Sequence, residues 1–247
     1  MPHKIYDLGV RIYLKRIKGS PKVLTNSTWT RDLILKAYGV DAELLPPPIN
    51  LEAYRKAFSY KDRGKTVVTV SRFSPEKDFS IVLKAASVLR EYHFIIAGST
   101  SKYSGLVLKS LRGAIRKYDL NNVSIIENPD RGELINVLAR STFYLHPKYP
   151  EHFGVAIVEA VASGCIPLVY RDGGSWKDVV SQISDELGYT DVADIVRAVK
   201  KIEENEGLRE TLRFKGLQTV KQFDYNIFKS KLKSIVESIA SRTAERH

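Results

Sequence analysis

Residues 66–77, TVVTVSRFSPEK, join two patterns that together decide the fold. The first five residues are all β-branched, which is typical of a buried strand. The next seven are mostly polar and include a proline, and from Asp78 onward apolar residues recur at helical spacing. A strand that leads through a short loop into a helix is the first half of a β-α-β unit, so this stretch predicts one such unit of a parallel sheet.

The same alternation continues along the chain. Apolar, β-branched runs predict further strands at 93–97, 123–126, 142–146 and 167–170. Helical spacing predicts helices at 78–91, 103–118, 131–140 and 154–163. Five strands with four helices between them predict an α/β fold, a Rossmann-like doubly wound parallel sheet. Ligands bind such sheets beyond the carboxyl ends of the strands, so the residues that follow each strand are the site candidates.

The two ends of the chain have different patterns. Residues 23–27 predict one more strand, followed by a helix over about 29–38. The triplet Pro46-Pro47-Pro48 cannot continue a helix or a central strand, so we expect an interdomain linker at 44–50. Further helices are predicted over 191–204, 206–221 and 224–240. The expected organisation is an N-terminal domain remnant with its linker (1–46), the sheet domain (47–223), and a C-terminal helix and tail (224–247).

Composition and charge narrow the range of partners. The chain has 247 residues, of which 43% are apolar and 27% charged, an ordinary composition for a globular domain. Its 39 basic and 28 acidic residues give a formal charge of +11, which attracts nucleic acid, an acidic membrane surface or phosphorylated small molecules. A solvated lysine-rich surface explains the surplus equally well. No basic run alternates with aromatic residues as in proteins that read RNA or DNA, so nucleic acid is the weaker interpretation.

The cysteine content and the N-terminus suggest a location. Cys165 is the single cysteine, which excludes an intrachain disulfide and favours a reducing compartment. It has no Cys or His neighbour at metal-binding spacing, so we expect a buried structural thiol. Residues 1–18 lack the apolar core of a signal peptide, and we expect no membrane span. Their apolar residues have helical spacing beside basic ones, which fits a helix on an acidic membrane or a segment packed against protein. The expected location is cytoplasmic. If residues 1–18 form a helix on an acidic membrane, the protein is expected at the inner membrane face.

Two cations flank the loop that follows the strand at 66–70. Arg72 offers a planar fork of donors and Lys77 a point charge, and both lie near the start of a helix. Such a loop can hold a diphosphate between the cations and the helix N-terminus, each charge-assisted bond contributing roughly 1.5–3 kcal/mol. By themselves the two cations fit a solvated loop somewhat better, so the other motifs decide.

Residues 147–160, PKYPEHFGVAIVEA, carry two acidic residues in different settings. Glu151 lies in the loop after a strand, whereas Glu159 lies within the next helix. One carboxylate can then bind the hydroxyls of one sugar and the other those of a second, while Gly154 leaves room for a ligand at the helix start. Glu159 has apolar neighbours and needs a partner such as a ribose diol, unless it lies on the solvated face. His146 is expected to pack at the strand end.

In combination these stretches resemble the retaining glycosyltransferases of the GT-B fold (glycosyl transferases group 1, family four), over about residues 23–180. The matching pieces are Asn26-Ser27 at a strand end, the proline-rich linker, residues 71–77, Ala97-Gly98, residues 151–159, residues 164–169 and Gly173-Gly174. The wording of residues 151–154 is closest to mannosyltransferases that extend lipid-linked oligosaccharides. The resemblance implies that the chain is the C-terminal, donor-binding half of such a fold.

The resemblance also implies roles for the matching residues. Arg72 and Lys77 would hold the donor diphosphate and stabilise it as it leaves, and Glu151 would bind hydroxyls of the transferred sugar. These three form the predicted catalytic set, and Glu159 would bind the ribose. The other predicted donor-binding residues are Phe153, Gly154 and Val155, whose backbone would contact sugar and phosphates, Asn128 at the nucleobase edge, and Gly98.

The expected reaction is transfer of a hexose from a UDP-, GDP- or ADP-sugar to a sugar, lipid-linked or protein acceptor, with retention of the anomeric configuration. The mannosyltransferase wording favours GDP-mannose. The family generally needs no metal, and the chain has no Asp-x-Asp motif, so no cofactor is expected. Most of the family's N-terminal domain, which supplies much of the acceptor site, has no match. The alternatives are therefore a noncatalytic donor-binding subunit that needs a separate acceptor-binding chain and, with less support, a nucleic-acid-associated Rossmann protein.

Overall fold

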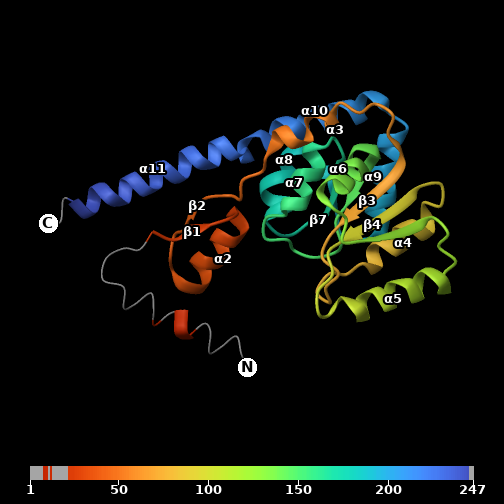
Figure 1. The fold of residues 1–247 in the computed structure, drawn as a ribbon, viewed down its shortest axis with the longest axis horizontal. Coiled ribbons are helices and arrows are strands. Elements are labelled where there is room, and N and C mark those ends of the chain that lie inside the picture. The colour runs from red at the N-terminus through yellow and green to blue at the C-terminus, as the bar shows by residue number, and fades with distance from the viewer. Residues whose placement is uncertain (1–7, 11, 13–21, 245–247) are drawn as a thin grey trace.

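The computed structural model describes residues 8–10, 12 and 22–244. The two interpretations of residues 1–18 therefore fall almost entirely outside the described residues. Six strands of the described residues form one parallel sheet (Figure 1), and pair in the order β5-β4-β3-β6-β7-β8. They are β3 (Gly64–Val70), β4 (His93–Gly98), β5 (Val123–Glu127), β6 (Ser141–Leu145), β7 (Ile166–Tyr170) and β8 (Gly188–Tyr189). The five predicted strands are confirmed, and β8 was missed because two residues carry no periodic pattern.

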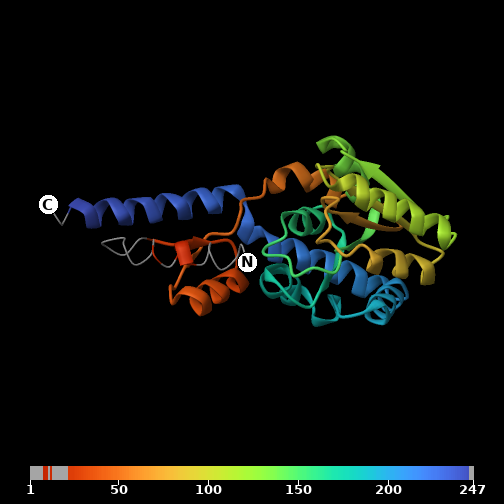
Figure 2. The same ribbon diagram turned by 90° about the horizontal axis from the view of Figure 1, so that it is seen from below.

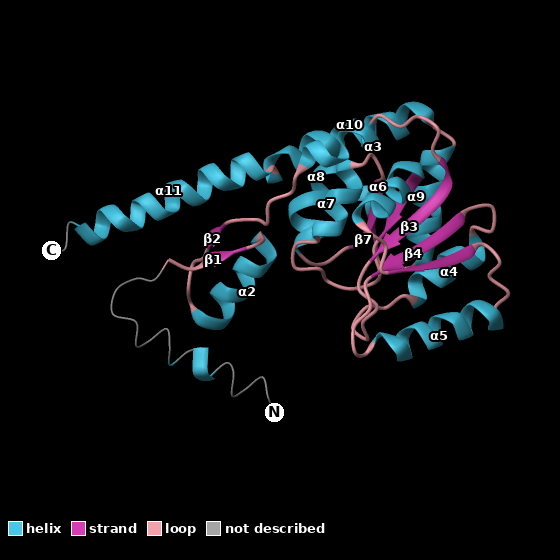
Figure 3. Cartoon of the chain, in the orientation of Figure 1, coloured by secondary structure: helices cyan, strands magenta, loops and turns pink. Residues whose placement is uncertain are grey.

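The strand order reverses between β3 and β6. The chain first moves outward through β3, β4 and β5, and then returns to β6 before it continues to β7 and β8. The connecting helices are α4 (Ser80–Val88), α5 (Ser104–Lys117), α6 (Arg131–Arg140) and α7 (Val155–Ala162). Because parallel crossovers are right-handed, the reversal brings α4 and α5 to one face and α6 and α7 to the other (Figure 3). The predicted doubly wound sheet is confirmed, and its switch point lies between β3 and β6.

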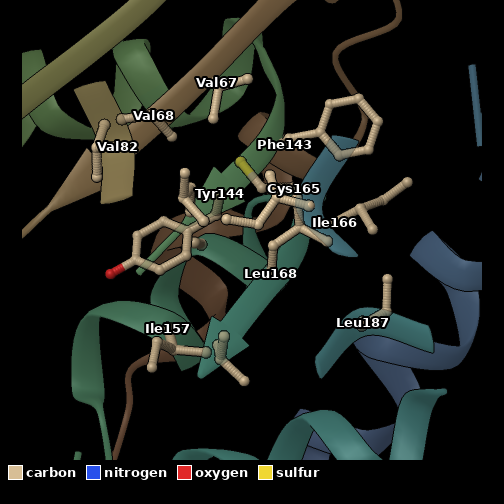
Figure 4. Packing of buried hydrophobic residues seen from close by; sticks show 14 of the residues in the cluster. Val67, Val68, Val82, Phe143, Tyr144, Ile157, Cys165, Ile166, Leu168 and Leu187 are labelled. Atoms are coloured by element: carbon tan, nitrogen blue, oxygen red, sulfur yellow. The ribbon is translucent and has the colours of Figure 1, made fainter. Parts of the chain in front are cut away.

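The centre of the sheet is buried on both faces, which explains its continuous apolar runs. All five residues of β6 are buried. Figure 4 shows side chains of β3, β6 and β7 packed together, with the sulfur of Cys165 among them. Cys165 is 2% exposed, and burial raises the pKa of its thiol to about 11. The prediction of a buried structural thiol is therefore confirmed.

Three helices complete the C-terminal part of the chain. They are α9 (Val192–Glu203), α10 (Glu206–Val220) and α11 (Tyr225–Ala244). In α9, Ile195, Val199 and Ile202 recur at helical spacing and are all buried, as expected of an amphipathic helix. The helix packs against α4, while α10 packs against α7. All three predicted helices are present, and none of the helices in the described ranges is both long and apolar enough to span a bilayer.

A small N-terminal unit lies beside the sheet domain. Its elements are β1 (Leu24–Thr25), α2 (Thr28–Tyr38) and β2 (Glu43–Leu44), and the two strands pair in parallel. Ser27 caps α2 by accepting a hydrogen bond from the backbone N–H of Thr30, and Gly39 ends it with a φ of +68°. The sequence assigned Leu44 to the linker and so missed β2. Figures 1 and 2 both show this unit and α11 on the same side of the sheet domain.

Six further short elements of the described residues were not predicted. They are 3-10 turns at Leu51–Tyr54, Asp185–Leu187 and Lys221–Phe223, α3 (Arg55–Phe58), a π-helical turn (Ser175–Val180) and α8 (Ser181–Ile183). Each is too short for an apolar period to repeat, so sequence spacing carries little information about them. The linker at 44–50 precedes the first of these elements. Its end is held in place, because Ile49 exchanges backbone hydrogen bonds with Phe223 and Tyr225 (2.8 and 3.1 Å). The linker and the start of α11 therefore lie together.

One partly buried cation joins several elements below the sheet. Arg63 lies just before β3, and its guanidinium donates to the backbone carbonyls of Ala57 (2.7 Å), Leu138 (3.1 Å), Ser141 (2.7 Å) and Ser163. Several of these carbonyls end α6 and α7, where the helix dipole places partial negative charge. Arg63 thereby ties the ends of three helices to the start of the sheet.

Arg63→Met keeps the aliphatic stem and removes all of these donors. We expect the free energy of unfolding to fall by at least about 2 kcal/mol, because buried carbonyls lose a charged partner. The matched control is Lys65→Met, which breaks the ion pair of an exposed lysine with the partly exposed Glu203 (3.4 Å) and is expected to cost under about 0.5 kcal/mol. Urea unfolding of both variants measures the difference, and equal losses would contradict the role of Arg63.

Candidate active site

A cavity of about 670 Å³ opens at the switch point of the sheet. Its walls come from the loops after β3, β4, β5 and β6, from the start of α7, and from Asn26 and Pro47 of the N-terminal part. All nine predicted site residues line it: Arg72, Lys77, Gly98, Asn128, Glu151, Phe153, Gly154, Val155 and Glu159. Residues up to 87 positions apart in sequence therefore meet at one edge of the sheet, as the parallel topology requires.

The centre of the cavity is an ion pair between two predicted residues. Lys77 is buried, and its Nζ lies 2.6 Å from Oε2 of Glu151. The same ammonium lies 3.8 Å from the centre of the Tyr149 ring, a cation–π contact. A backbone bridge between Asp78 and Lys148 joins the loops after β3 and β6 beside this pair. Two loops that are separated by two strands in sequence thus position one cation against one carboxylate.

A histidine faces the same carboxylate. His146 is 3% exposed, and its Nε2 lies 3.5 Å from Oε2 of Glu151. Burial lowers the pKa of His146 below its ordinary value, and the nearby Lys77 lowers it further, against the opposing influence of Glu151. Burial by itself would raise the pKa of Glu151, but the nearby His146 ring and the hydrogen bond and charge of Lys77 outweigh it. The pKa of Glu151 falls to about 2.

Arg72 has a different environment from Lys77. Its side chain is 72% exposed, and its guanidinium lies 3.9 Å from the Glu76 carboxylate, which also accepts a hydrogen bond from the Ser74 hydroxyl (2.7 Å). An exposed pair at this distance is worth little and is easily exchanged for another partner. Arg72 is therefore free to reach an anion in the cavity, whereas Lys77 is held in place.

Glu159 is buried in α7 and has a partner that the sequence did not indicate. Its Oε1 accepts a hydrogen bond from the Arg131 guanidinium at 2.9 Å. Arg131 starts α6 and lies over the ring of Tyr54, 5.2 Å from its centre. The prediction that Glu159 is buried and needs a partner is confirmed, and the alternative of a solvated face is wrong. Residue spacing gives no signal for Arg131, because it comes from another helix.

The start of α7 requires glycine. Gly154 has a φ of +88°, in the left-handed region, and a Cβ there would lie 2.6 Å from Cδ1 of Ile157. In the first turn, the N–H of Ile157 donates to the Gly154 carbonyl at 2.9 Å, whereas those of Val155 and Ala156 have no preceding helix carbonyl to which they can donate. The helix begins on the cavity wall, so these groups are available to an anionic ligand.

Gly98 and Asn128, two other predicted site residues, have structural roles at the cavity rim. At Gly98, a Cβ would lie 1.9 Å from the carbonyl oxygen of Ser71, so glycine lets the loop after β3 approach β4. Asn128 has a φ of +52°, and its side chain exchanges hydrogen bonds with Thr100. These contacts explain both residues without a ligand. Their contact with a nucleotide stays a prediction.

The N-terminal unit reaches the cavity through α2. The Trp29 ring packs at a tilt on His152, with ring centres 5.3 Å apart, and its Nε1 donates to Asp172 at 2.9 Å. The backbone N–H of Thr28 donates to Asp178 at 2.7 Å. The unit is therefore attached to the loops that follow β6 and β7. Trp29 and the cavity residue Asn26 had no assigned role in the sequence, although Asn26 belongs to a motif that matched.

Known proteins resemble this chain in sequence and in fold. The family model "Glycosyl transferases group 1" matches residues 51–218. A Mus musculus protein, GDP-Man:Man(3)GlcNAc(2)-PP-Dol alpha-1,2-mannosyltransferase, is 28% identical over 174 residues, which cover 64% of this chain and 35% of that protein. HepE from Anabaena, in complex with UDP and glucose, matches with a TM-score of 0.79 and 18% identity, over 96% of this chain and 69% of that one. Sucrose-phosphate synthase from Thermosynechococcus elongatus matches with a TM-score of 0.81 and 17% identity, over 97% and 62%.

The doubly wound sheet and its switch-point cavity define a Rossmann-like domain of the GT-B kind, as the solved structures share. The chain belongs to the glycosyl transferases group 1 family. The resemblance and the fold predicted from sequence are therefore confirmed. The chain spans about a third of the length of the mouse relative.

Glu151→Gln removes the carboxylate charge and keeps the side-chain size. At pH 7 we expect a loss of about 2 kcal/mol in unfolding free energy, because Lys77 becomes a buried cation without a counter-charge. The pKa of Glu151 falls from 4.5 to about 2 on folding, so its stabilisation is complete above the unfolded value and is lost as the pH falls. The penalty is expected to persist at pH 5 and to shrink at pH 3 in urea unfolding. The exposed Glu91→Gln variant is the control, and a penalty that grows at pH 3 would exclude this ion-pair account.

Proposed function

We propose that this chain provides the donor site of a retaining glycosyltransferase, which transfers a hexose from a nucleoside diphosphate sugar to an acceptor. The observation that carries this proposal is the ion pair of buried Lys77 with the partly exposed Glu151 at the switch point, with exposed Arg72 beside it. A cation and a hydroxyl-binding carboxylate at one point match the place where a diphosphate joins a sugar. Membership of the glycosyltransferase family supports the same reaction class.

In this proposal the two cations assist the departure of the nucleotide. Negative charge grows on the diphosphate as its bond to the sugar breaks, and Arg72 and Lys77 neutralise that charge. The first-turn N–H groups of α7, from Gly154 onward, lie at the same end of the cavity and add to this stabilisation. Glu151 accepts hydrogen bonds from the sugar hydroxyls, and Glu159 from the ribose. No metal is required in this scheme, since the chain's own cations carry the charge.

The name of one relative supports a proposal for the donor and the acceptor. The mouse protein's name specifies a GDP-mannose donor and a dolichyl-diphosphate-linked oligosaccharide acceptor. We therefore propose GDP-mannose as the donor and a lipid-linked saccharide as the acceptor of this chain. Such an acceptor would place the reaction at a membrane surface, with the protein on the cytoplasmic side, and the +11 charge suits an acidic surface.

A second candidate is a noncatalytic donor-binding subunit. It would bind the same donor in the switch-point cavity and take its acceptor-binding residues from another chain. We also propose the domain boundaries expected from the sequence, with an N-terminal remnant and linker up to residue 46 and a C-terminal helix and tail from residue 224. Nothing in the comparisons favours a nucleic-acid-associated protein. Transfer of mannose by the chain alone, measured with GDP-mannose and a lipid-linked acceptor, would exclude the subunit.

Lys77→Ala tests the diphosphate site. We expect the affinity for GDP to fall at least about tenfold, corresponding to one charge-assisted hydrogen bond of about 1.5 kcal/mol. Lys84→Ala, an exposed lysine on α4, is the matched control and is expected to leave the affinity unchanged. Calorimetric titration with GDP, UDP and ADP compares the nucleotides at the same time. An unchanged GDP affinity in Lys77→Ala would remove this residue from the site.

Glu159→Ala tests the ribose contact. Because the carboxylate is proposed to bind ribose hydroxyls, we expect a greater loss of affinity for GDP than for pyrophosphate, which has no ribose. The difference is expected to be about tenfold, and the two ligands control for any general damage to the cavity. Calorimetry on the same preparation measures both. Equal losses for GDP and pyrophosphate would show that Glu159 acts on the cavity as a whole.

A further inference from the structure

His146 carries an unpaired nitrogen in a buried position. The residue follows β6 and lines the cavity, yet it is only 3% exposed. Tyr189 of β8 holds its backbone by donating a hydroxyl hydrogen bond to the His146 carbonyl at 2.6 Å. Within the described residues, Nε2 of His146 has no hydrogen-bond partner. An unpaired buried nitrogen costs roughly 1–3 kcal/mol, so its presence in a site requires an explanation.

The other ring nitrogen allows two hydrogen-bond arrangements. Nδ1 of His146 lies 3.2 Å from the Tyr144 hydroxyl, which also lies 3.0 Å from the Val70 carbonyl. The hydroxyl has one proton and can donate it either to Val70 or to Nδ1. In the first arrangement the histidine proton is on Nδ1 and Nε2 is bare. In the second, Nδ1 accepts and the proton of the neutral ring is on Nε2, facing Glu151.

Glu151 needs a second partner during the proposed reaction. Its Oε2 is bound by Lys77 at 2.6 Å and approached by Nε2 of His146 at 3.5 Å. Lys77 is also the residue proposed to neutralise the donor diphosphate, and one ammonium cannot serve both anions at full strength. The other carboxylate oxygen, Oε1, accepts a hydrogen bond from the backbone N–H of His152 at 3.2 Å, so a weakened Lys77 contact leaves Oε2 as the oxygen that lacks a donor. The imidazole is the other donor within reach of Oε2.

We propose that His146 is a positioning residue, which donates a hydrogen bond from Nε2–H to Glu151 when the donor diphosphate engages Lys77. This inference rests on the proposed function and deepens it. A shift of roughly half an ångström brings the two atoms to an ordinary N–H···O distance. The ring stays neutral and takes up no proton, since in the second arrangement Nδ1 accepts from the Tyr144 hydroxyl and the ring proton is already on Nε2. Glu151 thereby keeps its aim at the sugar hydroxyls.

Two amide variants separate this role from simple packing. In His146→Gln the side-chain amide reaches the place of Nε2, whereas in His146→Asn it reaches only the place of Nδ1. We expect His146→Asn to keep its affinity for GDP within about threefold and to lose at least about tenfold for GDP-mannose, the equivalent of one hydrogen bond to a charged group. His146→Gln is expected to restore GDP-mannose affinity to within about threefold of the wild type. Calorimetry with both ligands, after thermal unfolding has shown that each variant is folded, measures the four constants.

Equal losses for GDP and GDP-mannose, or a glutamine variant no better than the asparagine variant, would overturn the proposal. A ligand-free measurement tests the coupling separately. The groups that face the ring are Glu151, Lys77 and Tyr144, and NMR titration reports the His146 imidazole directly. In Lys77→Met we expect the pKa of His146 to rise, because a repelling cation is gone and Glu151 faces the ring alone. An unchanged pKa would disprove the coupling, while a wild-type chain that binds neither ligand would instead disprove the proposed function.

Discussion

The loop after β7 lies so close to the backbone of Glu151 that two successive positions exclude a side chain. A Cβ at Gly173 would lie 2.5 Å from the Glu151 carbonyl oxygen, and one at Gly174 would lie 1.8 Å from that of His152. The N–H of Gly174 donates to the Glu151 carbonyl at 2.7 Å. Glu151 is therefore held by backbone contacts before its side chain meets any partner. Gly174 also lies against Ser27, so the same contact joins the N-terminal unit to the cavity.

The elements that could be predicted from sequence are those in which burial repeats. Val67 and Val68 belong to a strand that is covered on both faces, and Ile195 and Val199 to a helix with one buried stripe. β8 and the π-helical turn at 175–180 do not arise from a repeating pattern of burial. Their conformation comes from contacts across the fold, since a Cβ at Gly188 would lie 2.6 Å from the Trp176 ring. Such constraints leave no periodic trace in the sequence.

The sequence predicts where the site residues lie better than it predicts which side chains they contact. The carboxyl ends of parallel strands meet at one edge, so residues after β3 and β6 converge whatever their type, and Lys77 and Glu151 do so. Pairs between side chains depend on how distant helices pack. Arg131 reaches Glu159 from another helix, and no spacing rule connects the two. His146 was expected to pack at a strand end, which it does, but its unpaired nitrogen appears only in three dimensions.

Lys77 and Arg72, the two cations of the cavity, differ in burial, and this difference gives them different roles. Lys77 is already paired and enclosed, so it adds little field at a distance but requires no reordering when a ligand arrives. Arg72 is exposed and only loosely paired, so it supplies the attraction that draws an anion inward and loses side-chain freedom when it binds. Glu151 and Glu159 share one feature, because each is already paired with a cation, Lys77 and Arg131 respectively. A ligand that binds both must supply hydroxyl donors and phosphate charge together, which a nucleotide sugar does and free phosphate does not.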